Sequence, residues 1–195
     1  MRKPNRKSRS RSIHRKQEPV NEASLAHVAH HEAGHFVAGH WLLPRRQYLQ
    51  YSITVIPHRA TVGAVHGDSY EDVPARHMEA AVVTLYAGFA AEVEFDPKSR
   101  KQARLGACGD DRQAKDLLAV LERDGRKRRT RQARLRNRAA RFVQAHWQEI
   151  QALATKLVER KMLDGAEAGM IVEAAAGDKE AIETLAFWKL AGWSK

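Results

Sequence analysis

Residues 31–35 read His-Glu-Ala-Gly-His, and this short segment constrains the chain more than any other. Residues four apart lie on one face of an α-helix, so the two imidazoles reach a common point if the segment is helical. Glu32 lies beside them, and the small residues Ala33 and Gly34 permit close packing even though glycine weakens a helix. The segment therefore predicts a helix that carries a metal site.

The chemistry of this pattern favours Zn²⁺. A catalytic zinc ion has three protein ligands and an open position for water, whose pKa it lowers to about 7. His31 and His35 are the predicted ligands, and Glu32 is the predicted catalytic base that takes the proton from water as it attacks a carbonyl carbon. The expected reaction is hydrolysis of a peptide bond. A purely structural zinc site is the alternative, but it has no use for a base on the same helix.

The third ligand has to come from another part of the chain. The single cysteine, Cys108, excludes an internal disulfide and a multi-cysteine zinc site, and we predict that it is a small buried residue. Spacing alone leaves three carboxylates open as ligands: Asp110, Asp111 and Glu92. Asp111 can equally be a first-turn acid favoured by a helix dipole. Supporting or surface roles are predicted for the other histidines of the first helix: His27, His30 and His40.

The distribution of apolar residues predicts a mainly α-helical fold with one short β-hairpin between the first two helices. The hairpin is expected to pair residues 51–56 with residues 61–65. A loop through Gly106 and Gly109 is expected to precede a helix that begins at about Asp110 or Asp111. The other helices are predicted at residues 24–41, 74–95, 128–161, 164–175 and 179–193.

The net charge of +11 is concentrated in two segments. Residues 1–16 contain eight basic residues and no acid, and residues 123–141 contain ten basic residues and one acid. The remaining 16 basic and 22 acidic residues give the rest of the chain a net charge of −6. These two segments raise the possibility of a nucleic-acid or acidic partner, although basic runs are more often solvated tails or faces.

Three regions are expected from this composition: a disordered basic tail at 1–20, one domain at 21–177, and a C-terminal amphipathic helix at 178–195. No stretch approaches the roughly 18 apolar residues of a membrane span, and the basic N-terminus lacks the apolar core of a secretory signal. The sequence therefore predicts a cytoplasmic protein without a membrane partner.

Several motifs, in this order and spacing, resemble the peptidase domain of FtsH-type ATP-dependent zinc metalloproteases. The resemblance covers about residues 24–175 and is carried by the segments 31–36, 53–57 with Gly63, 85–92, 106–110, and 153–154 through 163–165. It implies a mostly helical domain at 21–177, with Asp110 as the third zinc ligand. It also implies that Glu92 supports a ligand or faces substrate.

The chain departs from this family in two respects. It has no apolar span and no Gly-x-x-x-x-Gly-Lys-Ser/Thr loop for ATP. The family has Asn before the ligand Asp and Arg within the second motif, where this chain has Gly109 and Phe89. The resemblance thus implies an endopeptidase that acts on flexible or unfolded segments of a peptide or protein substrate without its own ATPase, with a separate ATPase as a candidate partner. A weak or inactive peptidase-like domain that binds nucleic acid or an acidic partner is the alternative.

Overall fold

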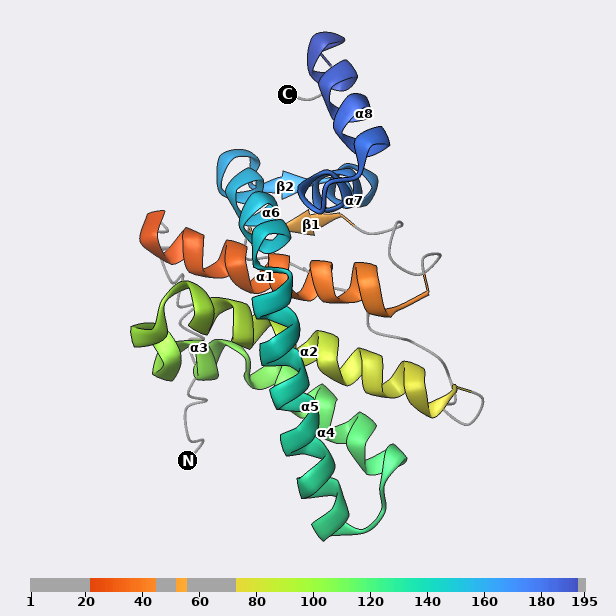
Figure 1. The fold of residues 1–195 in the computed structure, drawn as a ribbon. Coiled ribbons are helices and arrows are strands. Elements are labelled where there is room, and N and C mark those ends of the chain that lie inside the picture. Colours follow the sequence, from red (N-terminus) through yellow and green to blue (C-terminus); the bar gives the residue numbers. More distant parts are fainter. Residues whose placement is uncertain (1–21, 45–51, 56–72, 193–195) are drawn as a thin grey trace, which may run out of the picture.

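The computed structural model describes residues 22–44, 52–55 and 73–192. Nearly all of these residues are helical, which confirms the predicted mainly helical fold (Figure 1). In chain order the elements are α1 (Glu22–Leu42), β1 (Ile53–Thr54), α2 (Ala75–Phe95), η2 (Pro97–Ser99), α3 (Arg100–Gly106), α4 (Cys108–Leu121), α5 (Gly125–Ala145), α6 (Trp147–Arg160), β2 (Met162–Leu163), α7 (Gly165–Ala175) and α8 (Lys179–Leu190).

Helix α1 lies in the middle of the fold, with α2 on one side and α6, α7 and the small sheet on the other (Figure 1). One apolar cluster joins α1 to α6 and α7, and a second joins α2 to α4 and α5. The largest fully buried side chains of the first cluster are Val37, Ile53, Val143, Ile150, Leu153, Leu157, Leu163 and Val172. Because α1 is enclosed on both sides, histidines on it enter the interior and need polar partners there.

The strand β1 occupies the predicted position between the first two helices. It pairs antiparallel with β2, with Ile53 opposite Leu163 and Thr54 opposite Met162. Lys161 ends α6 in the left-handed conformation and directs the chain into β2. The segment 61–65, predicted as the second arm of a hairpin, lies outside the described residues.

The prediction of one helix over residues 128–161 is wrong, because the structure has two helices that meet at His146. The break lies at His146, whose backbone leaves helical geometry with φ −113° and ψ 27°. The burial pattern changes before this point: Leu135 of α5 belongs to the cluster with α2 and α4, whereas Val143 of α5 and Ile150 of α6 both belong to the cluster with α1. Neither glycine nor proline marks the break in the sequence.

The predicted loop through Gly106 and Gly109 is also wrong, since α3 and α4 cover this region with only Ala107 between them. Neither glycine has a positive φ, so both accept helical geometry. Asp110 therefore comes from the first turn of α4, where the helix dipole favours a carboxylate. Cys108, predicted to be buried, is exposed, because Ala107 and Ala114 face the interior instead.

The predicted domain boundaries at 1–20, 21–177 and 178–195 stay predictions. The tail at 1–20 lies outside the described residues, and α8 falls inside the predicted C-terminal helix and packs on α7. Asp178 caps α8 by accepting from the backbone N–H of Ala181, at 2.8 Å. Among the described helices, none combines the length and apolar character that a bilayer crossing requires.

Gly34→Ala is expected to lower the free energy of unfolding, because α1 and α2 are in contact at this glycine. A Cβ at Gly34 would lie 2.7 Å from the Ala87 carbonyl oxygen and 2.7 Å from the Ala91 Cβ. The helices must then separate, at a cost of about 1–3 kcal/mol. Urea denaturation of the metal-free protein measures this change. Gly109→Ala is the control: nothing lies within 4 Å of its Cβ, so equal or higher stability is expected. Equal stability of the two variants would contradict the prediction.

Candidate metal centre

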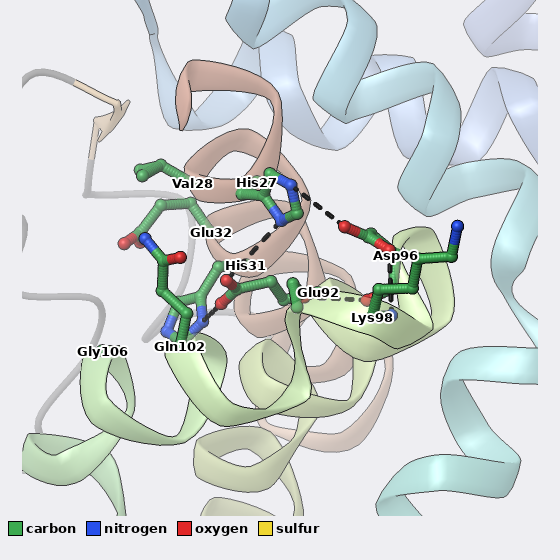
Figure 2. Close-up of a pocket in the computed structure, with 10 residues that line it drawn as sticks. His27, Val28, His31, Glu32, Glu92, Asp96, Lys98, Gln102 and Gly106 are labelled. Atoms are coloured by element: carbon green, nitrogen blue, oxygen red, sulfur yellow. Dashed lines mark hydrogen bonds and ion pairs between the residues drawn. The ribbon is translucent and has the colours of Figure 1, made fainter. Parts of the chain in front are cut away.

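A cavity of about 530 Å³ lies between the first half of α1, the end of α2, η2 and α3 (Figure 2). Its lining includes His27, His31, Glu32, Glu92, Asp96 and Gln102. Glu32 is half-buried at this cavity, and burial raises its pKa, an effect that the neighbouring His35 and His31 oppose only in part. A carboxylate with a raised pKa is a better proton acceptor, as a catalytic base requires.

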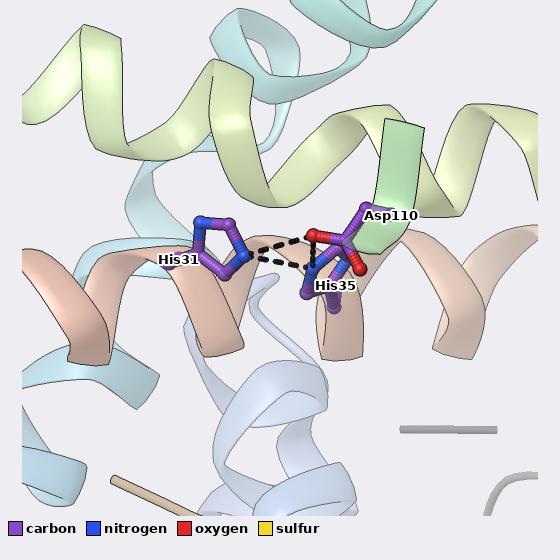
Figure 3. Close-up of side chains that lie close together, drawn as sticks. All are labelled: His31, His35 and Asp110. Atoms are coloured by element: carbon purple, nitrogen blue, oxygen red, sulfur yellow. Dashed lines mark hydrogen bonds and ion pairs between the residues drawn. The ribbon is translucent and has the colours of Figure 1, made fainter. Parts of the chain in front are cut away.

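His31 and His35 converge with Asp110 (Figure 3), and of these three His31 also lines the cavity. The Nε2 atoms of the two histidines are 3.1 Å apart. The Asp110 Oδ2 atom lies 3.2 Å from His31 Nε2 and 3.4 Å from His35 Nε2. Ligand atoms around a tetrahedral Zn²⁺ with bonds of about 2.1 Å are separated by about 3.4 Å. The three atoms therefore have the spacing of three corners of a tetrahedral zinc site.

The backbone of α2 determines which ring nitrogen of neutral His35 carries the proton. Its Nδ1 donates to the Thr84 carbonyl oxygen at 2.8 Å, and a carbonyl can only accept. In the neutral ring the lone pair is then on Nε2, which faces His31 and Asp110, as metal binding requires. The sequence offers no signal for Thr84, since every residue has a carbonyl group.

Gly88 of α2 provides the space for the His35 ring. A Cβ at this position would lie 2.4 Å from His35 Nε2, so any side chain would displace the imidazole. Glycine destabilises the middle of a helix unless close packing requires it. A glycine in the middle of a predicted helix is therefore the sequence signal for this position.

Glu92, near the end of α2, orients the other histidine. His31 Nδ1 donates to Glu92 Oε2 at 3.3 Å, and the Glu92 side chain is only 11% exposed. A carboxylate on the far nitrogen of a metal-binding imidazole keeps the near nitrogen in position and makes it more basic. The other carboxylate oxygen, Oε1, is 3.7 Å from His27 Nδ1, and His27 Nε2 is 3.6 Å from Asp96 Oδ2. The sequence pattern did not predict a role for Asp96 at this site.

Electrostatics link metal binding to proton release. Burial lowers the pKa of His31, but hydrogen bonds to Asp110 and Glu92 raise it by more, to about 9. Burial raises the pKa of Asp110, but hydrogen bonds from His31 and His35 outweigh burial and hold that pKa well below its usual range. In the metal-free protein at neutral pH, His31 is therefore protonated beside an ionised Asp110. A metal ion that uses both has to displace this proton.

The structure separates the three carboxylates that spacing left open. Asp110 is the one grouped with His31 and His35. Asp111 instead pairs with Lys115 Nζ at 2.7 Å and with the Arg136 guanidinium. Burial raises the pKa of Asp111, but these two cations together lower it below its usual value. Glu92 contacts His31 from the side away from Asp110.

The other histidines of α1 have partners of their own. His30 Nδ1 donates to the Ala26 carbonyl at 2.8 Å, and its ring stacks on Phe95 with centroids 3.8 Å apart. His40 Nε2 lies 3.3 Å from Glu173 Oε1. Within the described part of the chain, only His31, His35 and Asp110 form a group of three ligand atoms close enough for one ion.

Comparison with known proteins assigns no function, so the interpretation of this site rests on its geometry. The sequence matches no protein-family model and no curated protein.

Glu92→Gln is expected to weaken zinc binding about 10- to 100-fold, because the amide no longer offers a charged acceptor to His31 Nδ1. Competition with a chromophoric chelator measures this affinity. Glu149→Gln is a matched control, since Glu149 is also buried and also accepts from a histidine, His146 Nδ1 at 2.9 Å. Equal zinc affinity in the wild type and Glu92→Gln would remove the role assigned to Glu92.

Proposed function

We propose that this chain is a zinc-dependent endopeptidase that hydrolyses peptide bonds in flexible or unfolded protein segments. One observation carries the proposal: the Thr84 carbonyl aims the His35 Nε2 lone pair at the point where His31 and Asp110 also meet. The distances among the three atoms suit tetrahedral Zn²⁺.

The residues around this point supply the remaining requirements of hydrolysis. Bound zinc would polarise a carbonyl group and lower the pKa of water. Glu32 is adjacent to His31 on α1 and borders the same cavity, so it is positioned to take the proton from the attacking water. The cavity volume of about 530 Å³ lies within the usual range of ligand sites, about 300–1,000 Å³, and can admit a few residues of an extended substrate.

Glu32 and the cavity favour catalysis over a purely structural zinc. A structural site is closed by four protein ligands, whereas the described residues here bring together three. The position of Glu32 at a cavity is unnecessary for a structural role and necessary for a hydrolytic one.

The resemblance to FtsH-type peptidase domains supports the same proposal through particular residues. Gly34 and Gly88, which belong to the motifs that carry the resemblance, both lie where α1 packs on α2, with no room for a Cβ. We extend the proposal to a cytoplasmic enzyme to which a separate ATPase delivers substrate.

Metal removal and replacement test the proposal. The purified full chain is expected to contain about one zinc ion per chain and to cleave casein, an unstructured protein. Dialysis against 1,10-phenanthroline is expected to abolish cleavage, and added Zn²⁺ is expected to restore it. Stoichiometric zinc without any cleavage, with or without an ATPase partner, would leave the metal site intact and refute the peptidase proposal.

A further inference from the structure

Five of the nine basic residues of α5 form a straight stripe along one face of the helix. They are separated alternately by four and three residues, a spacing that keeps side chains on one face. The basic stripe consists of Lys127, Arg131, Arg134, Arg138 and Arg141. At a rise of about 1.5 Å per residue, it extends for about 21 Å along the helix.

Part of the basic stripe is neutralised within the protein and part is not. Arg131 Nε lies 3.1 Å from Glu79 Oε1, and Arg134 contacts the same carboxylate oxygen at 2.5 Å. Lys127, Arg138 and Arg141 are exposed, and the described residues provide no ion pair for them. These three cations are available to an outside partner.

The only acid of this segment does not neutralise the stripe. Asp124 caps α5, where its Oδ1 atom accepts from the backbone N–H groups of Arg126 and Lys127, both at 2.8 Å. Like charges four residues apart destabilise a helix, as in the pairs Lys127/Arg131 and Arg134/Arg138. Basic residues in the first turn also oppose the helix dipole. A polyanion bound along the stripe would relieve both effects.

The buried side of α5 fixes the direction in which the stripe faces. Leu135, Ala139 and Val143 are each at most 1% exposed and pack into the body of the protein. The stripe lies on a different side of the helix, and none of its five members is apolar or aromatic. A protein partner normally buries apolar or aromatic anchors at the centre of its interface, and the stripe has none to offer.

We propose that the basic stripe of α5 binds the phosphodiester backbone of nucleic acid without reading its sequence. The cations recur about every 5 Å along the helix, which is the scale of the phosphate spacing of about 3.4 Å per strand of a duplex. Arginine, which forms four of the five positions, binds phosphate oxygens with two parallel N–H groups. The absence of aromatic residues excludes base stacking by the stripe. The inference does not depend on the peptidase proposal.

The test compares the full wild-type chain with the triple variant Lys127→Gln/Arg138→Gln/Arg141→Gln. Fluorescence anisotropy with a duplex DNA of mixed sequence gives the binding constant at several salt concentrations. Each lost phosphate contact reduces the slope of log K against log salt by about 0.9. The triple variant is therefore expected to lose roughly 2–3 units of slope and roughly 10- to 100-fold in affinity at ~0.1 M salt. A second duplex of different sequence is expected to bind equally.

The control is Lys156→Gln/Lys179→Gln/Lys189→Gln, which removes the same charge from exposed positions on α6 and α8. Equal losses in both triple variants would mean that net charge and not the stripe attracts DNA. An unchanged slope in the stripe variant would assign any binding to other basic residues, such as those at 1–16, and would overturn the proposal. The proposal would also be overturned if the wild type bound polyglutamate more tightly than DNA and the stripe variant lost that binding. Circular dichroism verifies that each variant is folded.

Discussion

Glu32→Gln is expected to slow cleavage of casein by about 10²- to 10⁴-fold while leaving zinc content at the wild-type level. Glutamine has nearly the shape of glutamate but cannot accept a proton from water. The substitution leaves untouched the contacts that hold the two histidine ligands, which come from Thr84 and Glu92. Initial rates of peptide release and the zinc content of the same samples measure the two quantities.

A control variant and the zinc content of Glu32→Gln determine how this result is interpreted. Glu183→Gln, on an exposed position of α8, removes the same charge far along the chain and is expected to leave the rate unchanged. If Glu32→Gln retained the wild-type rate with zinc bound, Glu32 would not be the base, and any cleavage would need another explanation. Loss of zinc in the variant would instead show that Glu32 helps to hold the metal.

His35→Ala and Asp110→Ala are each expected to reduce zinc affinity by more than about 100-fold, a larger effect than removal of a supporting residue. Either substitution leaves two ligand atoms where the geometry requires three. Zinc content after gel filtration and competition with a chelator measure the loss. Casein cleavage is expected to disappear in both variants.

Asp111→Ala is the control for Asp110→Ala, because it removes the neighbouring carboxylate. It breaks the ion pairs with Lys115 and Arg136 but leaves the three converging atoms in place. Its zinc affinity is expected to equal that of the wild type. The reverse order, with Asp111→Ala losing zinc and Asp110→Ala keeping it, would show that the third ligand has been misassigned.

Zinc affinity of the wild type is also expected to rise with pH. The pKa of His31 in the metal-free protein is raised to about 9, so below that pH zinc must displace a proton. The affinity gain should level off above that pH, where His31 is already neutral. In Asp110→Ala one of the two hydrogen bonds that raise this pKa is missing, so the residual zinc binding should vary less with pH.

Local patterns determined most of the helices. The spacing of apolar residues predicted the positions of α1, α2, α7 and α8, although α1 is enclosed on both sides and α8 buries only Ala181. The same reasoning failed at His146 and between Gly106 and Gly109. In the first case the backbone of His146 leaves helical geometry without a glycine or proline, and in the second the chain stays helical through two glycines. Neither outcome follows from the pattern of apolar residues.

The sequence by itself determined the pairing of His31 and His35, because four residues make one turn of a helix wherever that helix packs. It also placed Glu32 beside them. Residue spacing left Asp110 and Asp111 open, and the resemblance implied Asp110. The tertiary structure brings Asp110 to the histidines, since consecutive residues of a helix point about 100° apart and the packing of α4 decides which one faces α1. The orientation of both imidazoles was likewise decided by α2, through the Thr84 carbonyl and Glu92, which are distant in sequence from the histidines they hold.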